Sequence, residues 1–121
     1  IAEENLLQRG LELGEHIDQR FKDMAAKNSS SCIGDVRALG CMNAIEIVAD
    51  RDTREPAAEL TADIARIALS KGLILVTAGP ARNVIRVLVP LSTPTEIIDE
   101  GLEILEASIC EAMIAASPST A

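Results

Sequence analysis

One arginine interrupts an apolar run in the last third of the chain, and its surroundings suit anion binding. The run covers residues 84–89, and on a strand Arg86 would share a face with Val84 and Leu88. A guanidinium stays charged, so placing it among such residues is costly unless it has a partner. Its planar fork fits a carboxylate through two hydrogen bonds. Arg86 is therefore a candidate anion-binding residue; the alternatives are an edge-strand arginine that reaches solvent or a structural salt bridge to a carboxylate such as Glu46.

Two further arginines lie in segments that could border the same region. Arg37 follows Asp35 by two residues, so it can pair locally or across a sheet, and we expect a structural role for it. Arg82 adds a cation just after the turn at Gly79-Pro80, and the sequence leaves its direction open. Turn chemistry alone explains that turn, and a substrate-lining loop is the alternative.

The remaining reactive residue types form no catalytic or metal-binding motif. The sole histidine, His16, lies among carboxylates on an expected helix, and the serines at 29–31 lack a G-x-S-x-G context, so a Ser-His-Asp triad has no support. Three widely spaced cysteines without a CxxC pair argue against zinc and for reduced thiols. None of the three lysines lies in an apolar pattern suited to Schiff-base chemistry. We therefore expect no catalytic, cofactor-binding or metal-binding residue in this chain.

Composition limits the classes of function. The chain has 121 residues with a net charge of −8, so a nucleic-acid backbone would be repelled, and an anionic substrate would need a local cationic group. Hydrophobic residues make up 48%, with Phe21 the only aromatic, so aliphatic side chains must build the core of one domain spanning residues 1–121. Without an apolar run of membrane-spanning length or a signal peptide, we expect a cytoplasmic location. The chain begins at Ile1 inside an expected helix, which suggests a piece of a longer protein.

The first half of the chain predicts a helix followed by two strands. Apolar residues recur every three or four positions from Ala2 to Lys27, which is typical of an amphipathic helix. The segments 33–40 and 41–49 are rich in β-forming residues, and Gly40 is expected to mark a bulge or tight turn between them. A charged loop at 50–55 follows.

The second half predicts a helix, two strands and a long final helix. Pro56 is expected to open the helix and Gly72 to end it. Strands are expected at 73–77 and 84–89. Residues 93–96 form a capping box with proline at the first helical position, which predicts a helix from 94 to about 115. A frayed tail is expected at 117–121. This order predicts an α+β fold, a small antiparallel or mixed sheet with helices packed on one face.

Several motifs, in order and over nearly the whole chain, resemble the class-III aminotransferases, and within them the 4-aminobutyrate branch. The matching segments are Ile-Gly-Asp-Val-Arg-Ala-Leu-Gly-Cys-Met at 33–42, Ala-Ile-Glu-Ile-Val at 44–48, Ala-Leu-Ser-Lys-Gly-Leu-Ile-Leu at 68–75, Ala-Gly-Pro at 78–80, Asn-Val-Ile-Arg-Val-Leu-Val-Pro-Leu at 83–91 and Asp-Glu-Gly-Leu at 99–102. Ala38 departs from the pattern, because glycine is common there. The segment 83–91 is the most specific for the 4-aminobutyrate branch.

The resemblance implies the C-terminal small domain of a fold-type I enzyme that uses pyridoxal 5′-phosphate. It implies small-molecule amino and keto acids as substrates, and it implies that Arg86 binds a substrate carboxylate, as the family's arginine at this position does. The Schiff-base lysine and the phosphate-binding residues of such enzymes lie outside these motifs, so the chain alone is expected to be inactive and to bind no cofactor. A homodimer or higher oligomer is expected for the parent, and self-association is possible for the isolated chain.

The leading hypothesis is therefore part of a 4-aminobutyrate:2-oxoglutarate aminotransferase. A second hypothesis is another ω-aminotransferase of the same class, acting on β-alanine, 5-aminovalerate or ornithine. The third is a non-catalytic association or regulatory module.

Overall fold

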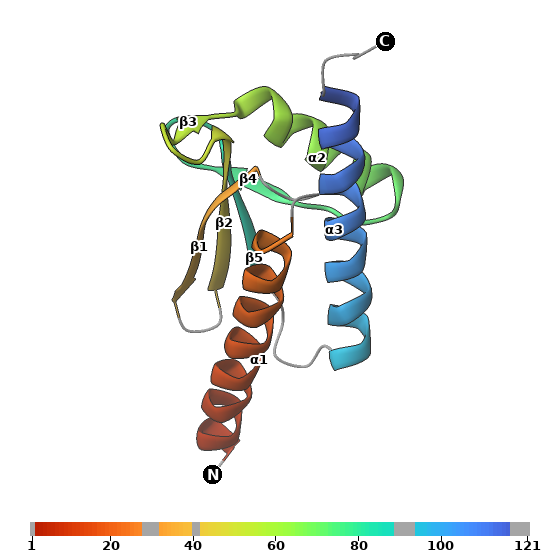
Figure 1. Cartoon of the computed structure of the whole chain (residues 1–121). Coiled ribbons are helices and arrows are strands. Elements are labelled where there is room, and N and C mark those ends of the chain that lie inside the picture. The colour runs from red at the N-terminus through yellow and green to blue at the C-terminus, as the bar shows by residue number, and fades with distance from the viewer. Residues whose placement is uncertain (1, 28–31, 40–41, 89–93, 117–121) are drawn as a thin grey trace.

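The computed structural model describes residues 2–27, 32–39, 42–88 and 94–116, which form three helices and five strands. The elements in order are α1 (Ala2–Ala25), β1 (Ile33–Leu39), β2 (Met42–Asp50), β3 (Glu55–Pro56), α2 (Ala58–Ser70), β4 (Val76–Ala78), β5 (Val84–Leu88) and α3 (Thr95–Ala116) (Figure 1). The expected order of elements is confirmed, with the two-residue β3 as an addition.

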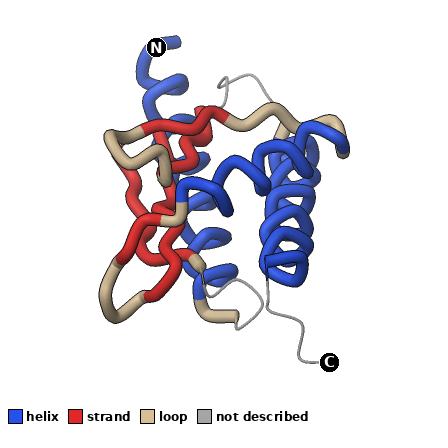
Figure 2. The backbone as a smooth tube through the Cα atoms, turned by 90° about the horizontal axis from the view of Figure 1, so that it is seen from above, coloured by secondary structure: helices blue, strands red, loops and turns tan. Residues whose placement is uncertain are grey.

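Strand β2 lies inside the sheet, and each strand pair in the described residues is antiparallel. The order is β1-β2-β5-β4, and β3 pairs with the end of β2. The sequence left antiparallel and mixed sheets open, and the antiparallel form is the one observed. Figure 2 shows the strands along one side of the molecule and α2 and α3 on the other. The predicted α+β fold with helices packed on one face of the sheet is confirmed.

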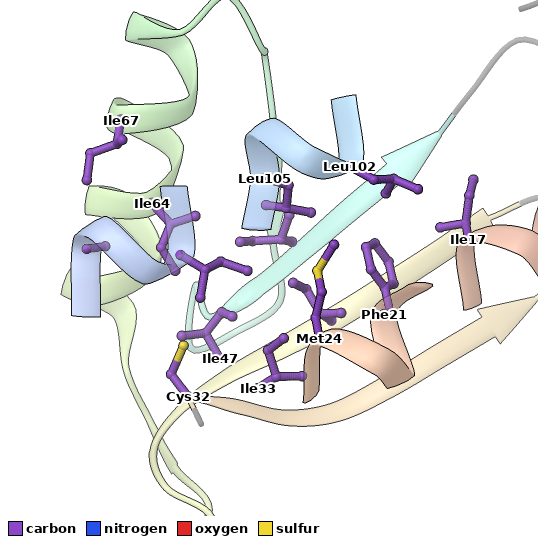
Figure 3. Packing of buried hydrophobic residues seen from close by; sticks show 14 of the residues in the cluster. Ile17, Phe21, Met24, Cys32, Ile33, Ile47, Ile64, Ile67, Leu102 and Leu105 are labelled. Carbon is purple, nitrogen blue, oxygen red and sulfur yellow. The ribbon is translucent and has the colours of Figure 1, made fainter. Parts of the chain in front are cut away.

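One face of the sheet supplies the core because side chains alternate along each strand. Ile45 and Ile47 of β2 and Ile85 of β5 are fully buried, and Ile45 is the register partner of Ile85. All three helices place apolar side chains against them (Figure 3). The helical members of this cluster are Leu13, Ile17, Phe21, Met24, Ile64, Ile67, Ile98, Leu102, Leu105, Ile109 and Ala112. Within the described part of the chain, no helix covers the opposite face of the sheet.

Pro56 was expected to open the second helix, and this prediction is wrong. It lies in β3 opposite Val48, and α2 begins two residues later with Ala57 as its N-cap, without a side-chain cap hydrogen bond. The Ala57 N–H donates to the Ile47 carbonyl oxygen at 3.2 Å, which holds the segment against the sheet. An edge position tolerates proline because no neighbouring strand needs its missing N–H. Sheet pairing therefore prevailed over the local helix-start signal.

Gly72 ends α2 as expected, but the strand after it starts later than the sequence indicated. Gly72 has φ +92°, its N–H donates to Leu69 O at 3.0 Å, and the Leu73 N–H donates to Ala68 O at 2.8 Å, which is a Schellman motif. The expected strand 73–77 is wrong for its first residues, since β4 comprises Val76–Ala78 only. Residues 76–78 are the ones that reach register with β5, so apolar character at 73–75 did not produce pairing.

Three of the expected features fall outside the described residues, and the described part of β1 contains a bulge that was not expected. The turn at Gly40, the capping threonine at 93 and the tail at 117–121 lie outside the described part of the chain. Within it, β1 shifts register between Ile33 and Asp35, where a Cβ on Gly34 would lie 2.7 Å from Val48 Cγ1. Glycine therefore permits the close approach of β1 to β2 at this bulge. No helix in the described ranges is both long and apolar enough to cross a membrane.

Candidate functional site

Arg86 lies in the middle of β5 and points away from the helices. Its register partners are Ala44 on β2 and Val76 on β4, while the neighbouring Ile85 faces the buried core. The alternation of a strand therefore places the guanidinium on the helix-free face. Arg86 is exposed, and no hydrogen bond or ion pair joins it to another described residue. Its alternative pairing with Glu46 is not observed.

A pocket of about 430 Å³ opens on this face next to Arg86. Its lining residues are Arg37, Ala44, Glu46, Gly79, Pro80, Ala81, Asn83, Val84 and Arg86. Three strands and the turn before β5 therefore contribute to one concavity. The lining includes the small residues Ala44, Gly79 and Ala81, and two arginines and one glutamate supply its charges.

Arg37 pairs with Glu46, the carboxylate in the described lining of the pocket. Arg37 Nη2 donates to Glu46 Oε2 at 2.7 Å, and Arg37 Nε donates to Asp35 Oδ2 at 3.1 Å. The expected structural pairing of Arg37, both local and across the sheet, is therefore observed. Because Arg37 is held by two carboxylates, Arg86 is the lining cation left available to an anionic ligand within the described part of the pocket.

The turn beside the pocket is fixed to the sheet by a buried asparagine. Asn83 is 6% exposed. Its side-chain Nδ2 donates to the backbone oxygen of Ile47 at 3.0 Å, and its backbone carbonyl oxygen accepts from the Ile47 N–H at 2.7 Å. Gly79 has φ +88°, which suits glycine, and its carbonyl accepts from the Arg82 N–H at 3.1 Å. Local turn chemistry was the expectation for this segment, and the role of Asn83 as its anchor was not part of it. A polar residue directly before a buried strand was the available signal.

Arg82 does not belong to the Arg86 pocket. It has φ +54° and lines a separate hollow of about 290 Å³ with residues of α2 and Thr77 of β4. The direction that the sequence left open is thus resolved: Arg82 and Arg86 serve different concavities.

A larger concavity of about 660 Å³ lies between β3, α2 and the end of α3. Its lining is mostly apolar, and its charged members are the acidic residues Glu59 and Asp63. Despite its size, such a wall disfavours an anionic ligand. We therefore place the candidate site at Arg86, where the charge fits a carboxylate.

Cys32, at the edge of the larger concavity, should be protected from alkylation. Burial raises the pKa of its thiol from 9.0 to about 11, so about 0.1% is thiolate at pH 8. The folded pKa is raised, so the associated stability is fully present below pH 9 and is lost as pH rises towards 11. Iodoacetamide labelling followed by peptide mass mapping should show slow reaction of Cys32 in buffer and fast reaction in urea. Equal rates in the two conditions would contradict this.

None of the three lysines lines the Arg86 pocket, so the described residues do not fit Schiff-base attachment of a cofactor. Lys22 pairs with Asp18 at 2.8 Å on α1, and Lys27 pairs with Glu106 at 2.7 Å. Lys71 lies 3.3 Å from Glu111. Among the residues described, no three side chains of the metal-binding types come together. The described lining of this pocket thus offers the exposed cation Arg86 to an anion, and it includes no lysine, cysteine or histidine.

Comparison with known proteins shows the family that the chain matches. A family model described as aminotransferase class-III matches residues 1–109. The chain is 46% identical over 110 residues to the 4-aminobutyrate aminotransferase GabT of Escherichia coli, covering 91% of this chain and 25% of that protein. It is 45% identical over 103 residues to the 5-aminovalerate aminotransferase DavT of Pseudomonas aeruginosa, covering 85% of this chain and 24% of that protein. The chain thus spans about a quarter of the length of the curated relatives it matches.

The fold also matches solved structures. The crystal structure of a Bacillus anthracis aminotransferase superposes with a TM-score of 0.79 at 25% identity, over 90% of this chain and 25% of that one. The α+β arrangement of this chain therefore also occurs as part of a longer aminotransferase chain.

Proposed function

Because the chain belongs to the class-III aminotransferase family, we propose that the protein carrying it is a 4-aminobutyrate:2-oxoglutarate aminotransferase. In this reaction the amino group of 4-aminobutyrate leaves as succinic semialdehyde forms, and 2-oxoglutarate takes the amino group up to become glutamate. The 46% identity to a 4-aminobutyrate aminotransferase supports this choice of donor. The chain acts as the small C-terminal domain of that enzyme.

Arg86 binds the α-carboxylate of glutamate and 2-oxoglutarate in this proposal. The observation that carries it is an arginine on a pocket wall that no described carboxylate neutralises, while its neighbour Arg37 is paired twice. A guanidinium holds a carboxylate in a defined plane through two hydrogen bonds, which orients the substrate for reaction. The second carboxylate of a dicarboxylate substrate needs a cation from elsewhere in the protein.

Pyridoxal 5′-phosphate is the cofactor that the family implies, and it supplies the electron sink for the amino transfer. The lysines of this chain are engaged on its surface, so the residues that hold the cofactor belong to the rest of the protein. The chain contributes one wall of a site that it does not complete. We accordingly expect the 121-residue chain alone to show no transaminase activity.

A second donor is favoured by a specific observation. The 45% identity to a 5-aminovalerate aminotransferase is nearly as high as the identity to the 4-aminobutyrate enzyme. 5-Aminovalerate is one methylene longer, and a methylene in a binding site changes discrimination by only about 10- to 200-fold. A modest change elsewhere in the protein could therefore exchange the two donors.

A donor panel on the full-length protein tests the proposal. We expect kcat/KM with 2-oxoglutarate as acceptor to be highest for 4-aminobutyrate, followed by 5-aminovalerate, β-alanine and ornithine, with glutamate formation as the readout. The isolated chain at equal molar concentration serves as the control without a complete site. A preference for 5-aminovalerate would replace the first donor by the second, and no turnover of any donor would favour a non-catalytic association module.

A further inference from the structure

We propose that Arg37 is a positioning residue that holds Glu46 away from Arg86 and so keeps the Arg86 guanidinium available for a substrate carboxylate. This inference rests on the carboxylate-binding role proposed for Arg86. Arg37 itself contacts no substrate in this arrangement, and it acts through the carboxylate that it holds.

The sheet brings the three charged groups into one pocket. Arg37 on β1 and Arg86 on β5 are both register partners of Ala44 on β2, so the two cations flank that small residue. Glu46 lies two residues further along β2 and projects from the same face. All three charged side chains line the pocket of about 430 Å³. Glu46 is therefore placed between two possible cationic partners.

Glu46 is close enough to Arg86 to compete for it. Glu46 is opposite Val84, two residues from Arg86 on β5, which makes Glu46 and Arg86 diagonal neighbours. Diagonal pairs on adjacent antiparallel strands lie about 7–8 Å apart at the backbone, within reach of long side chains. If Glu46 pairs with Arg37, the Arg86 guanidinium stays available to a ligand, and if Glu46 pairs with Arg86, it does not.

The observed contacts favour Arg37. Its Nη2 reaches Glu46 at 2.7 Å, and a second contact to Asp35 at 3.1 Å orients the guanidinium. The Glu46 side chain is only 18% exposed, compared with 57% for Arg37. A carboxylate with that little solvent needs a cationic partner, so removal of Arg37 should redirect Glu46 to Arg86.

Four full-length variants test this, with the KM for 2-oxoglutarate and the inhibition constant of glutarate, an unreactive dicarboxylate, as readouts. Arg37→Met should raise both about fivefold, in keeping with the modest strength of a partly exposed ion pair, and leave kcat nearly unchanged. Arg37→Met with Glu46→Gln should restore both values. Arg37→Met with Asp35→Asn restores the same net charge but leaves Glu46 free, so both values should stay raised. Arg86→Gln serves as the reference for loss of the carboxylate contact.

The outcomes separate this inference from the proposed function. Equal rescue by the two double variants would show a general charge effect, and no rescue by either would show a direct or structural role of Arg37; each overturns the proposal. If Arg86→Gln weakens both dicarboxylates while Arg37→Met changes nothing, the positioning role fails and the proposed function stands. If Arg86→Gln changes nothing, the carboxylate-binding role itself fails. Circular dichroism of each variant confirms that the fold is retained.

Discussion

Replacing Arg86 with glutamine in the full-length protein should lower kcat/KM for 2-oxoglutarate and for glutamate by about 30- to 1,000-fold, or about 2–4 kcal/mol. The guanidinium is the pocket cation that has no partner among the described residues. A charge-assisted bidentate contact reaches this strength when the site excludes water around the bound substrate. Glutamine keeps hydrogen-bonding capacity and much of the side-chain length, but it removes the charge. The loss should therefore report the ionic contact.

Arg82→Gln is the matched control for that experiment. Arg82 is exposed and close in sequence, but it lines a different hollow. Glutamine also meets the same positive φ at this position, so the backbone term is similar to that of arginine. We expect kinetics within a factor of two of the unchanged protein. Single-turnover measurement of the glutamate half-reaction shows whether the loss falls on carboxylate binding. Unchanged constants for Arg86→Gln would exclude its proposed role.

Replacing Phe21 with alanine should lower the free energy of unfolding by about 3–5 kcal/mol. Phe21 is fully buried on α1, and it is the only aromatic residue in the chain. Its ring packs among aliphatic residues of the sheet and the helices in the core (Figure 3). Alanine would leave a cavity that β-branched neighbours, restricted at χ1, refill poorly.

Urea unfolding followed by far-ultraviolet circular dichroism measures this change. Leu69→Ala is the control, because Leu69 is also an apolar helical residue but is 60% exposed. We expect that substitution to change the free energy of unfolding by less than about 0.5 kcal/mol. A Phe21→Ala loss as small as the control would mean that α1 does not depend on this contact to stay on the sheet.

Much of the fold followed from local patterns. The three- and four-residue spacing of Leu13, Ile17, Phe21 and Met24 predicted the buried face of α1, and those residues are buried. Gly72 ended its helix as a glycine with positive φ should. These predictions succeeded because periodicity and backbone sterics act over a few residues and need no knowledge of distant neighbours.

Where local signals met tertiary contacts, the contacts prevailed. Pro56 carried a helix-start signal but became an edge-strand residue because Val48 lay opposite it. Residues 73–75 had strand composition, yet pairing began at Val76, where β5 came into reach. Strand pairing depends on which segments meet in space, so composition alone does not define strand ends.

In the candidate site too, the sequence determined the residue types and the tertiary structure determined their contacts. The sequence determined that Arg86 is a charged residue on an apolar strand, and the family resemblance indicated a carboxylate as its ligand. Only the tertiary structure decided which cation Glu46 takes, because residues 37, 46 and 86 come from three strands whose register is a property of the whole sheet. It also separated Arg82 from Arg86, four residues apart in sequence but facing different concavities. The sequence specifies the type of each residue, whereas the pairing of charged side chains depends on distances that exist only after folding.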